Sequence, residues 1–332
     1  MSANRRQILD WVANGHLAAD KLEQALTLTN SVLNATSKLR FLSRVILAFA
    51  VASLCAGVTF FFAYNWDDLS RFGKFTLAQG ALLLSLLPLL RFKLAHPVAQ
   101  AAIFSASLLL GALLALVGQT YQSGADSYQL FLTWALFIIP WALLARMPAL
   151  WLLLLALLNL SLVLALDSFA LYSLPQPFTH PGWLLFALNF CAAAVWLLIS
   201  GFLPARLLLR WGQRLINLYS LLIITFLAVG FALSPSHGDI LALPVWALFS
   251  ALWLYIYRLH QLDLVMLSAL LMATIVLAIA IVTHALTDAV STFGLFLVLA
   301  LLVMGLSSVA ALWLKQLSQQ ADNQAEERSG YD

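Results

Sequence analysis

Two polar segments, residues 65–74 and 119–129, stand between long apolar runs and hold the side chains best suited to chemistry. Their carboxylates and amides can hydrogen-bond to hydroxyl groups, and their Trp and Tyr rings can stack against flat apolar faces. This set suits a polar ligand with hydroxyls, such as a sugar or a lipid headgroup. The candidate ligand-binding residues are Asn65, Trp66, Asp67, Asp68, Lys74, Gln119, Tyr121, Gln122, Asp126 and Tyr128.

The same residues have a structural interpretation. The aromatic rings fall where a membrane protein places its interfacial aromatic belt, and Asp67 can pair locally with Arg71. Adjacent carboxylates alone do not make an acid/base pair, which needs opposed environments and a suitable separation. No catalytic residue is therefore assigned.

A second set of ionisable residues lies in other loops on the same predicted side of the membrane. Their types suit a divalent metal, but their loops are separate and no compact ligand motif joins them. No metal and no cofactor is expected, and no nucleotide-binding glycine loop or nucleophile elbow is apparent. These residues are Asp167, His180, His237, Asp239, His284 and Asp288.

The elements that must position these loops are membrane spans. The chain is 63% hydrophobic and 9% charged, far from the roughly 25% charged residues of a soluble domain. A span needs about 20 apolar residues, and the sequence predicts an all-α protein with ten of them. They cover residues 45–64, 75–92, 97–118, 128–145, 149–166, 182–203, 214–233, 239–257, 264–284 and 290–314.

The basic residues predict the orientation of these spans. All of the 17 Lys and Arg residues except Arg71 and Lys74 fall on the side that holds the N-terminus. Because basic residues in short loops are retained in the cytoplasm, both termini are predicted to be cytoplasmic. The net charge of +3 then reflects orientation in the bilayer, and nucleic acid is excluded as a partner.

Four segments are expected. Residues 1–44 form a cytoplasmic amphipathic helical hairpin that packs on the spans or docks a protein partner. Residues 45–166 hold spans 1–5, and residues 167–314 hold spans 6–10. Residues 315–332 are polar, without an apolar stripe, and are expected to be a disordered tail.

Within the spans, two features bear on function. Asn159 and Asn189 are predicted to hydrogen-bond across a helix pair as structural groups. Pro88, Pro140 and Pro244 can bend their helices, and a five-plus-five division of the spans would match an inverted-repeat transporter with a cavity near Pro140 or Pro244. No ionisable residue falls at mid-span, which argues against a proton-coupled pump.

The second polar segment and the span after it form a distinctive motif. Its residues are Gly118, Gln119, Tyr121, Gln122, Gly124, Ala125, Asp126 and Tyr128, then Leu130, Phe131, Trp134, Pro140, Trp141 and Arg146, with Asn65, Trp66 and Lys74 in the first loop and Trp11 and Gly15 before the membrane. This motif resembles that of a known family, the bacterial predicted membrane proteins called domain of unknown function 2157. The resemblance implies a multi-pass protein of the bacterial cytoplasmic membrane, but no catalytic residue, substrate or cofactor.

The function expected from the sequence is a non-enzymatic envelope protein of the bacterial inner membrane. It would bind a polar or lipid-linked ligand at the two outer loops, with the lipid bilayer as its surroundings. The first alternative is a small-molecule transporter, and the second is a membrane-embedded hydrolase or transferase.

Overall fold

The computed structural model contains helices and connecting turns, with no strand in the part of the chain that it describes. The chain forms two compact units, one that joins Met1–Leu54 with Leu312–Asp332 and one that consists of Cys55–Ala311. The described residues are 8, 11–12, 16–18, 21–22, 35–64, 69–121, 124–168, 180–200, 210–235, 239–260, 262–287 and 289–329.

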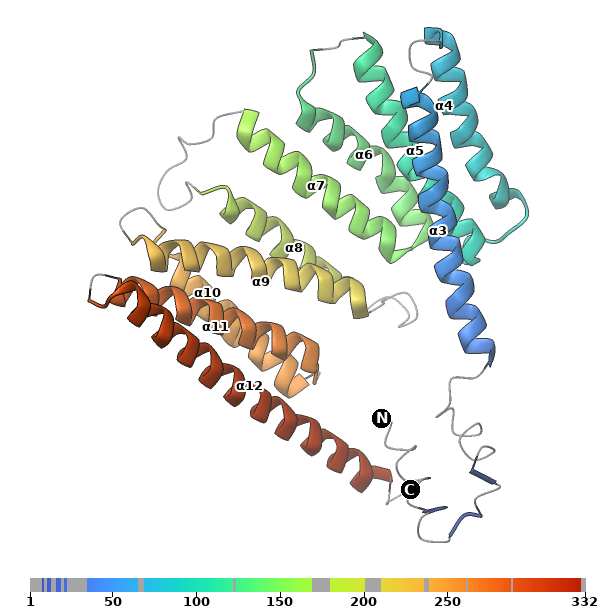
Figure 1. Cartoon of the computed structure of the whole chain (residues 1–332). Coiled ribbons are helices and arrows are strands. Elements are labelled where there is room, and N and C mark those ends of the chain that lie inside the picture. The colour runs from blue at the N-terminus through green and yellow to red at the C-terminus, as the bar shows by residue number, and fades with distance from the viewer. Residues whose placement is uncertain are drawn as a thin grey trace. The chain divides into compact units, whose positions relative to one another are not determined.

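The helices follow the apolar runs of the sequence (Figure 1). Eight described helices are long and apolar enough to cross a membrane, and Gly182–Leu198 is apolar but shorter. The helices are α3 (Ala35–Tyr64), α4 (Arg71–Leu86), η2 (Leu87–Leu90), α5 (Pro97–Tyr121), α6 (Ser127–Ala145), α7 (Pro148–Ser168), α8 (Gly182–Ser200), α9 (Arg210–Leu233), α10 (Ala242–Tyr255), η4 (Ile256–His260), α11 (Leu264–Leu286) and α12 (Thr292–Ser329).

The predicted all-α membrane fold is confirmed, although eight of the described helices meet the length and composition of a span, against the ten predicted. Hydrocarbon offers no hydrogen bonds to the backbone, so each apolar run must satisfy its own N–H and C=O groups as a helix. The α3 helix contains the whole of the first predicted span, residues 45–64. The cytoplasmic location of the termini and the four-segment division stay predictions.

One expectation, at the C-terminal end, is corrected. The polar tail expected to be disordered is helical as far as Ser329, because α12 runs on without a break from its apolar part. Gln, Ala and Glu are good helix formers, and an existing helix removes the cost of nucleation. At the other end α3 begins at Ala35, inside the segment expected to be the cytoplasmic hairpin, most of which lies outside the described residues.

The prolines expected to bend spans have different positions. Pro88 lies in the 3₁₀ segment η2, where α4 ends, and Pro140 lies inside α6. Pro244 lies in the first turn of α10, where its missing N–H would have had no helical partner in any case. Pro244 therefore does not break the interior of a helix.

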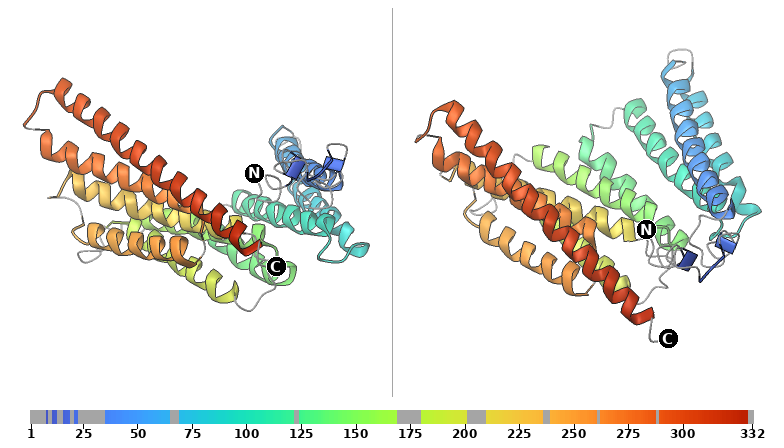
Figure 2. Two further views of the ribbon diagram at one scale, coloured as in Figure 1. Left: turned by 90° about the horizontal axis from the view of Figure 1, so that it is seen from below. Right: turned by 60° about the horizontal axis from the view of Figure 1, so that its bottom comes forward.

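Within the Cys55–Ala311 unit, helices that are consecutive in sequence pack as neighbours from α4 to α8. Short connections favour this arrangement. The α9 helix then takes a central place, in contact with α8, α10 and α11 (Figure 2). One stripe of α9 remains exposed, at Leu215, Tyr219, Leu222, Phe226 and Leu233.

A pair of amides joins α7 to α8. Asn189 Nδ2 donates to Asn159 Oδ1 at 2.6 Å, and Asn159 Nδ2 donates to Asn189 Oδ1 at 3.2 Å. Each amide also donates to a carbonyl of its own helix at 2.8 Å. The predicted structural role of these two residues is confirmed.

Candidate functional site

The described candidate residues lie at the ends of three helices. Lys74 is in the first turn of α4, Gln119 and Tyr121 close α5, Asp126 precedes α6, and Tyr128 is in its first turn. We call the surface formed by these five residues the polar face. The other candidates, Asn65, Trp66, Asp67, Asp68 and Gln122, lie outside the described residues.

One contact joins two helix ends of the polar face, and a second holds the third helix end in place. The rings of Phe75, next to Lys74, and Tyr121 lie 5.9 Å apart, so the start of α4 adjoins the end of α5. Ser161 Oγ of α7 donates to the Tyr128 carbonyl at 3.0 Å, which joins the start of α6 to α7. The described end of the first polar loop therefore lies beside the second loop.

Asp126 occupies a helix N-cap without acting as a cap. Its backbone is extended, with φ −63° and ψ 151°, as at other N-caps, but its side chain accepts no hydrogen bond from the first turn of α6. Ser70, at the same position before α4, accepts from Gly73 N at 3.1 Å. The carboxylate of Asp126 is exposed instead.

Other residues of the sequence signature pack helices together. Trp134 of α6 donates from Nε1 to the Ser107 carbonyl of α5 at 2.8 Å. Its ring lies so close to Gly111 that a Cβ there would be 2.4 Å from it. Arg146 ends α6 in the left-handed conformation, with φ 47°. Trp134 thus holds α6 against α5, and these two helices carry four of the five polar-face residues.

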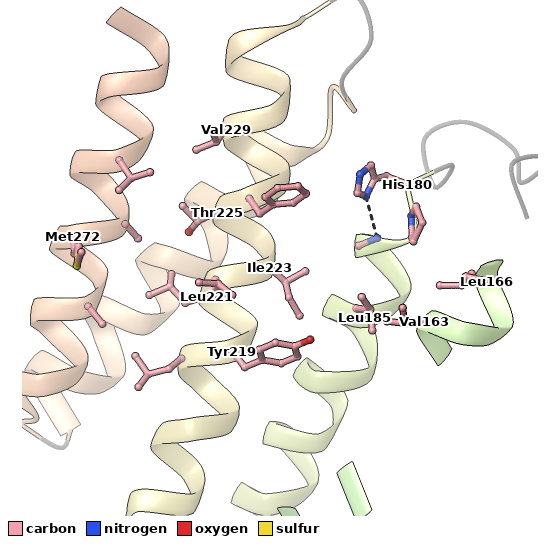
Figure 3. A pocket seen from close by; sticks show the side chains of 18 of the residues that line it. Val163, Leu166, His180, Leu185, Tyr219, Leu221, Ile223, Thr225, Val229 and Met272 are labelled. Carbon is pink, nitrogen blue, oxygen red and sulfur yellow. Dashed lines mark hydrogen bonds between the residues drawn. The ribbon is translucent and has the colours of Figure 1, made fainter. Parts of the chain in front are cut away.

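A cavity of about 980 Å³ lies among α7, α8, α9 and α11. Its lining includes Asp167 at the end of α7 and His180 before α8. The remaining lining is mostly apolar, and Figure 3 shows His180 above the apolar side chains of α8 and α9. None of the five polar-face residues lines it, and neither Pro140 nor Pro244 does. The cavity predicted for a transporter near those prolines is therefore not this one.

The sequence reasoning considered Asp167 and His180 only as metal ligands and missed the cavity. The described residues contain no group of three metal-ligating side chains. Asp239 accepts from Trp183 Nε1 at 2.7 Å, and His180 Nδ1 accepts from Gly182 N at 3.0 Å. A signal for the cavity was the pair Ala269 and Ala273, one turn apart in α11, which leaves space against α9.

Comparison with known families covers the part of the chain that holds the polar face. Residues 9–151 match the DUF2157 family of predicted membrane proteins. This confirms the resemblance seen in the sequence. The DUF2157 match ends near the start of α7, so the four helices around the cavity lie largely beyond it. No curated protein and no solved structure matches the chain.

Proposed function

We propose that this protein is a non-enzymatic protein of the bacterial inner membrane that binds a polar or lipid-linked ligand on the polar face, with that face directed outward. The observation that carries the proposal is the state of Asp126, an exposed carboxylate at an N-cap whose capping bond is not made. An N-cap bond stabilises a protein by about 1 kcal/mol. The carboxylate of Asp126 does not contribute this capping energy, and it is available to bind a ligand.

A second aspartate, Asp263, shows what a capping carboxylate does in this protein. Asp263 precedes α11, where its Oδ1 accepts from Val265 N at 3.1 Å and from Met266 N at 3.4 Å. Its Oδ2 also pairs with Arg214 Nε at 2.8 Å. Asp263 and Asp126 thus occupy equivalent helix positions, but only the carboxylate of Asp263 caps its helix.

The chemistry of the polar face favours a ligand with hydroxyl groups. The carboxylate of Asp126 and the amide of Gln119 are exposed and can bond to hydroxyls. The ring of Tyr121 is 67% exposed and can stack on the apolar face of a sugar. A lipid-linked sugar would place its headgroup here and its chain in the bilayer.

The test compares Asp126→Ala with Asp263→Ala in purified protein. We expect Asp126→Ala to lower stability by less than about 1 kcal/mol, the effect of an exposed carboxylate on the helix dipole. It should lose the polar or lipid-linked molecules that copurify with the wild type, as measured by mass spectrometry. Asp263→Ala should lower stability by about 2 kcal/mol, through the loss of the cap and the ion pair, and should keep those molecules per folded protein. Unchanged copurification in Asp126→Ala would overturn the proposal.

A further inference from the structure

The cavity among α7, α8, α9 and α11 is a second site, separate from the polar face. We infer that it holds one hydrocarbon chain of a zwitterionic phospholipid whose headgroup carries an amine, with that headgroup at Asp167 and His180. The proposal uses none of the five polar-face residues and stands independently of the proposed function.

The length of the cavity fits one leaflet of a bilayer. Along α9 it extends from Leu218 to Val229, which is about 16 Å at about 1.5 Å per residue. Half of a hydrocarbon core of about 30 Å is about 15 Å. The volume also lies at the upper end of the usual range for ligand pockets, about 300 to 1,000 Å³.

The sides of the cavity are open to the bilayer and shaped by small residues. Leu222, Phe226 and Met272 are 66%, 65% and 69% exposed, so a lipid can enter sideways from the membrane. On the other side, a Cβ at Gly182 would lie 2.8 Å from Leu227, so glycine allows α8 to approach α9 closely. The small side chain of Ala273 leaves space between α11 and α9.

The polar end selects the headgroup by charge. His180 Nδ1 accepts from Gly182 N at 3.0 Å, so the proton of the neutral ring is on Nε2, which can donate to a phosphate oxygen. The carboxylate of Asp167 can accept from an ammonium group. No Lys or Arg belongs to the described lining. The end therefore favours a headgroup that carries both phosphate and amine, and it repels a net anionic one.

A third polar group lies deeper in the cavity. Tyr219 is seven residues before Phe226 in α9, about 10 Å along the helix, and Phe226 is the residue whose ring lies 6.0 Å from that of His180. Figure 3 shows the Tyr219 hydroxyl directed from α9 toward α8. Tyr219 is 40% exposed and adjoins Leu218 at the far end of the cavity, where the end of the hydrocarbon chain would lie.

The test is retention of lipid by the full-length protein after exchange into nanodiscs that contain equal amounts of phosphatidylethanolamine and phosphatidylglycerol. After detergent extraction, native mass spectrometry counts the lipids that stay bound. We expect one phosphatidylethanolamine to be retained by the wild type. Asp167→Asn should reduce its preference over phosphatidylglycerol about tenfold, the effect of one charge-assisted hydrogen bond.

Matched variants separate this site from ordinary surrounding lipid. Ala273→Trp fills the cavity and should abolish retention, while Leu248→Trp, at a position that is 72% exposed on α10 and not in the cavity lining, should not. Equal retention of both lipids by the wild type, or a preference that Asp167→Asn does not alter, would overturn the inference even if Ala273→Trp failed to fold.

Discussion

The amide pair between α7 and α8 gives a direct test of what holds the membrane helices together. Replacing Asn189 by Leu removes both interhelical hydrogen bonds, at 2.6 and 3.2 Å, and leaves Asn159 Oδ1 without its partner. Asn189 is fully buried, so no water can take its place. Hydrogen bonds between membrane helices contribute about 0.6 kcal/mol on average and up to about 1.7. An orphaned acceptor adds about 1 kcal/mol or more.

We therefore expect Asn189→Leu to lower the free energy of unfolding by about 2 to 3 kcal/mol. The double variant Asn159→Leu/Asn189→Leu removes the orphaned acceptor and should be at least about 1 kcal/mol more stable than the sum of the two single changes predicts. Unfolding in mixed micelles with increasing sodium dodecyl sulfate, followed by tryptophan fluorescence, measures all four proteins. Additive losses, within about 0.3 kcal/mol, would refute the claim that the two amides act as a pair.

Three further predictions concern packing, a buried contact and orientation. Gly111→Ala would put a Cβ 2.4 Å from an indole ring of α6, and it should destabilise by about 1 to 3 kcal/mol in the same unfolding assay. Trp183→Phe removes the 2.7 Å hydrogen bond to Asp239, and it should cost about 1.5 to 3 kcal/mol; unchanged stability would show that this bond contributes nothing net. In a cysteine-free variant in intact spheroplasts, Ser123→Cys should react with an impermeant thiol reagent and Ala205→Cys should not. The opposite pattern would invert the predicted orientation.

Much of the fold could be predicted from the sequence because the bilayer permits few alternatives. Each apolar run had to become a helix, and the helix limits agree with the predicted spans to within a few residues at most positions. The error at α12 arose because disorder was inferred from the lack of an apolar stripe. A polar sequence with high helix propensity needs no stripe when it continues a helix that already exists.

The polar face and the cavity were harder to predict than the helices, because each is formed by residues from several helices whose packing partners the sequence does not specify. The position of Asp126 before α6 followed from the sequence, but the absence of its capping bond did not. The cavity depends on the packing of α7, α8 and α11 around α9, which no local pattern specifies. Asp167 and His180 were visible as polar residues in a loop, but their common cavity was not.

Arg146, at the end of α6, bears on both the stability of the folded protein and its insertion into the membrane. Arg146 adopts a left-handed backbone with φ 47°, a conformation that costs an L-residue about 1 kcal/mol and that glycine would adopt freely. In the predicted orientation, the same side chain is one of the charges that hold its loop in the cytoplasm while the chain inserts. Glycine would make a more stable protein and a weaker topological signal. In that orientation the arginine would act once, during insertion, whereas its left-handed backbone persists for as long as the molecule exists.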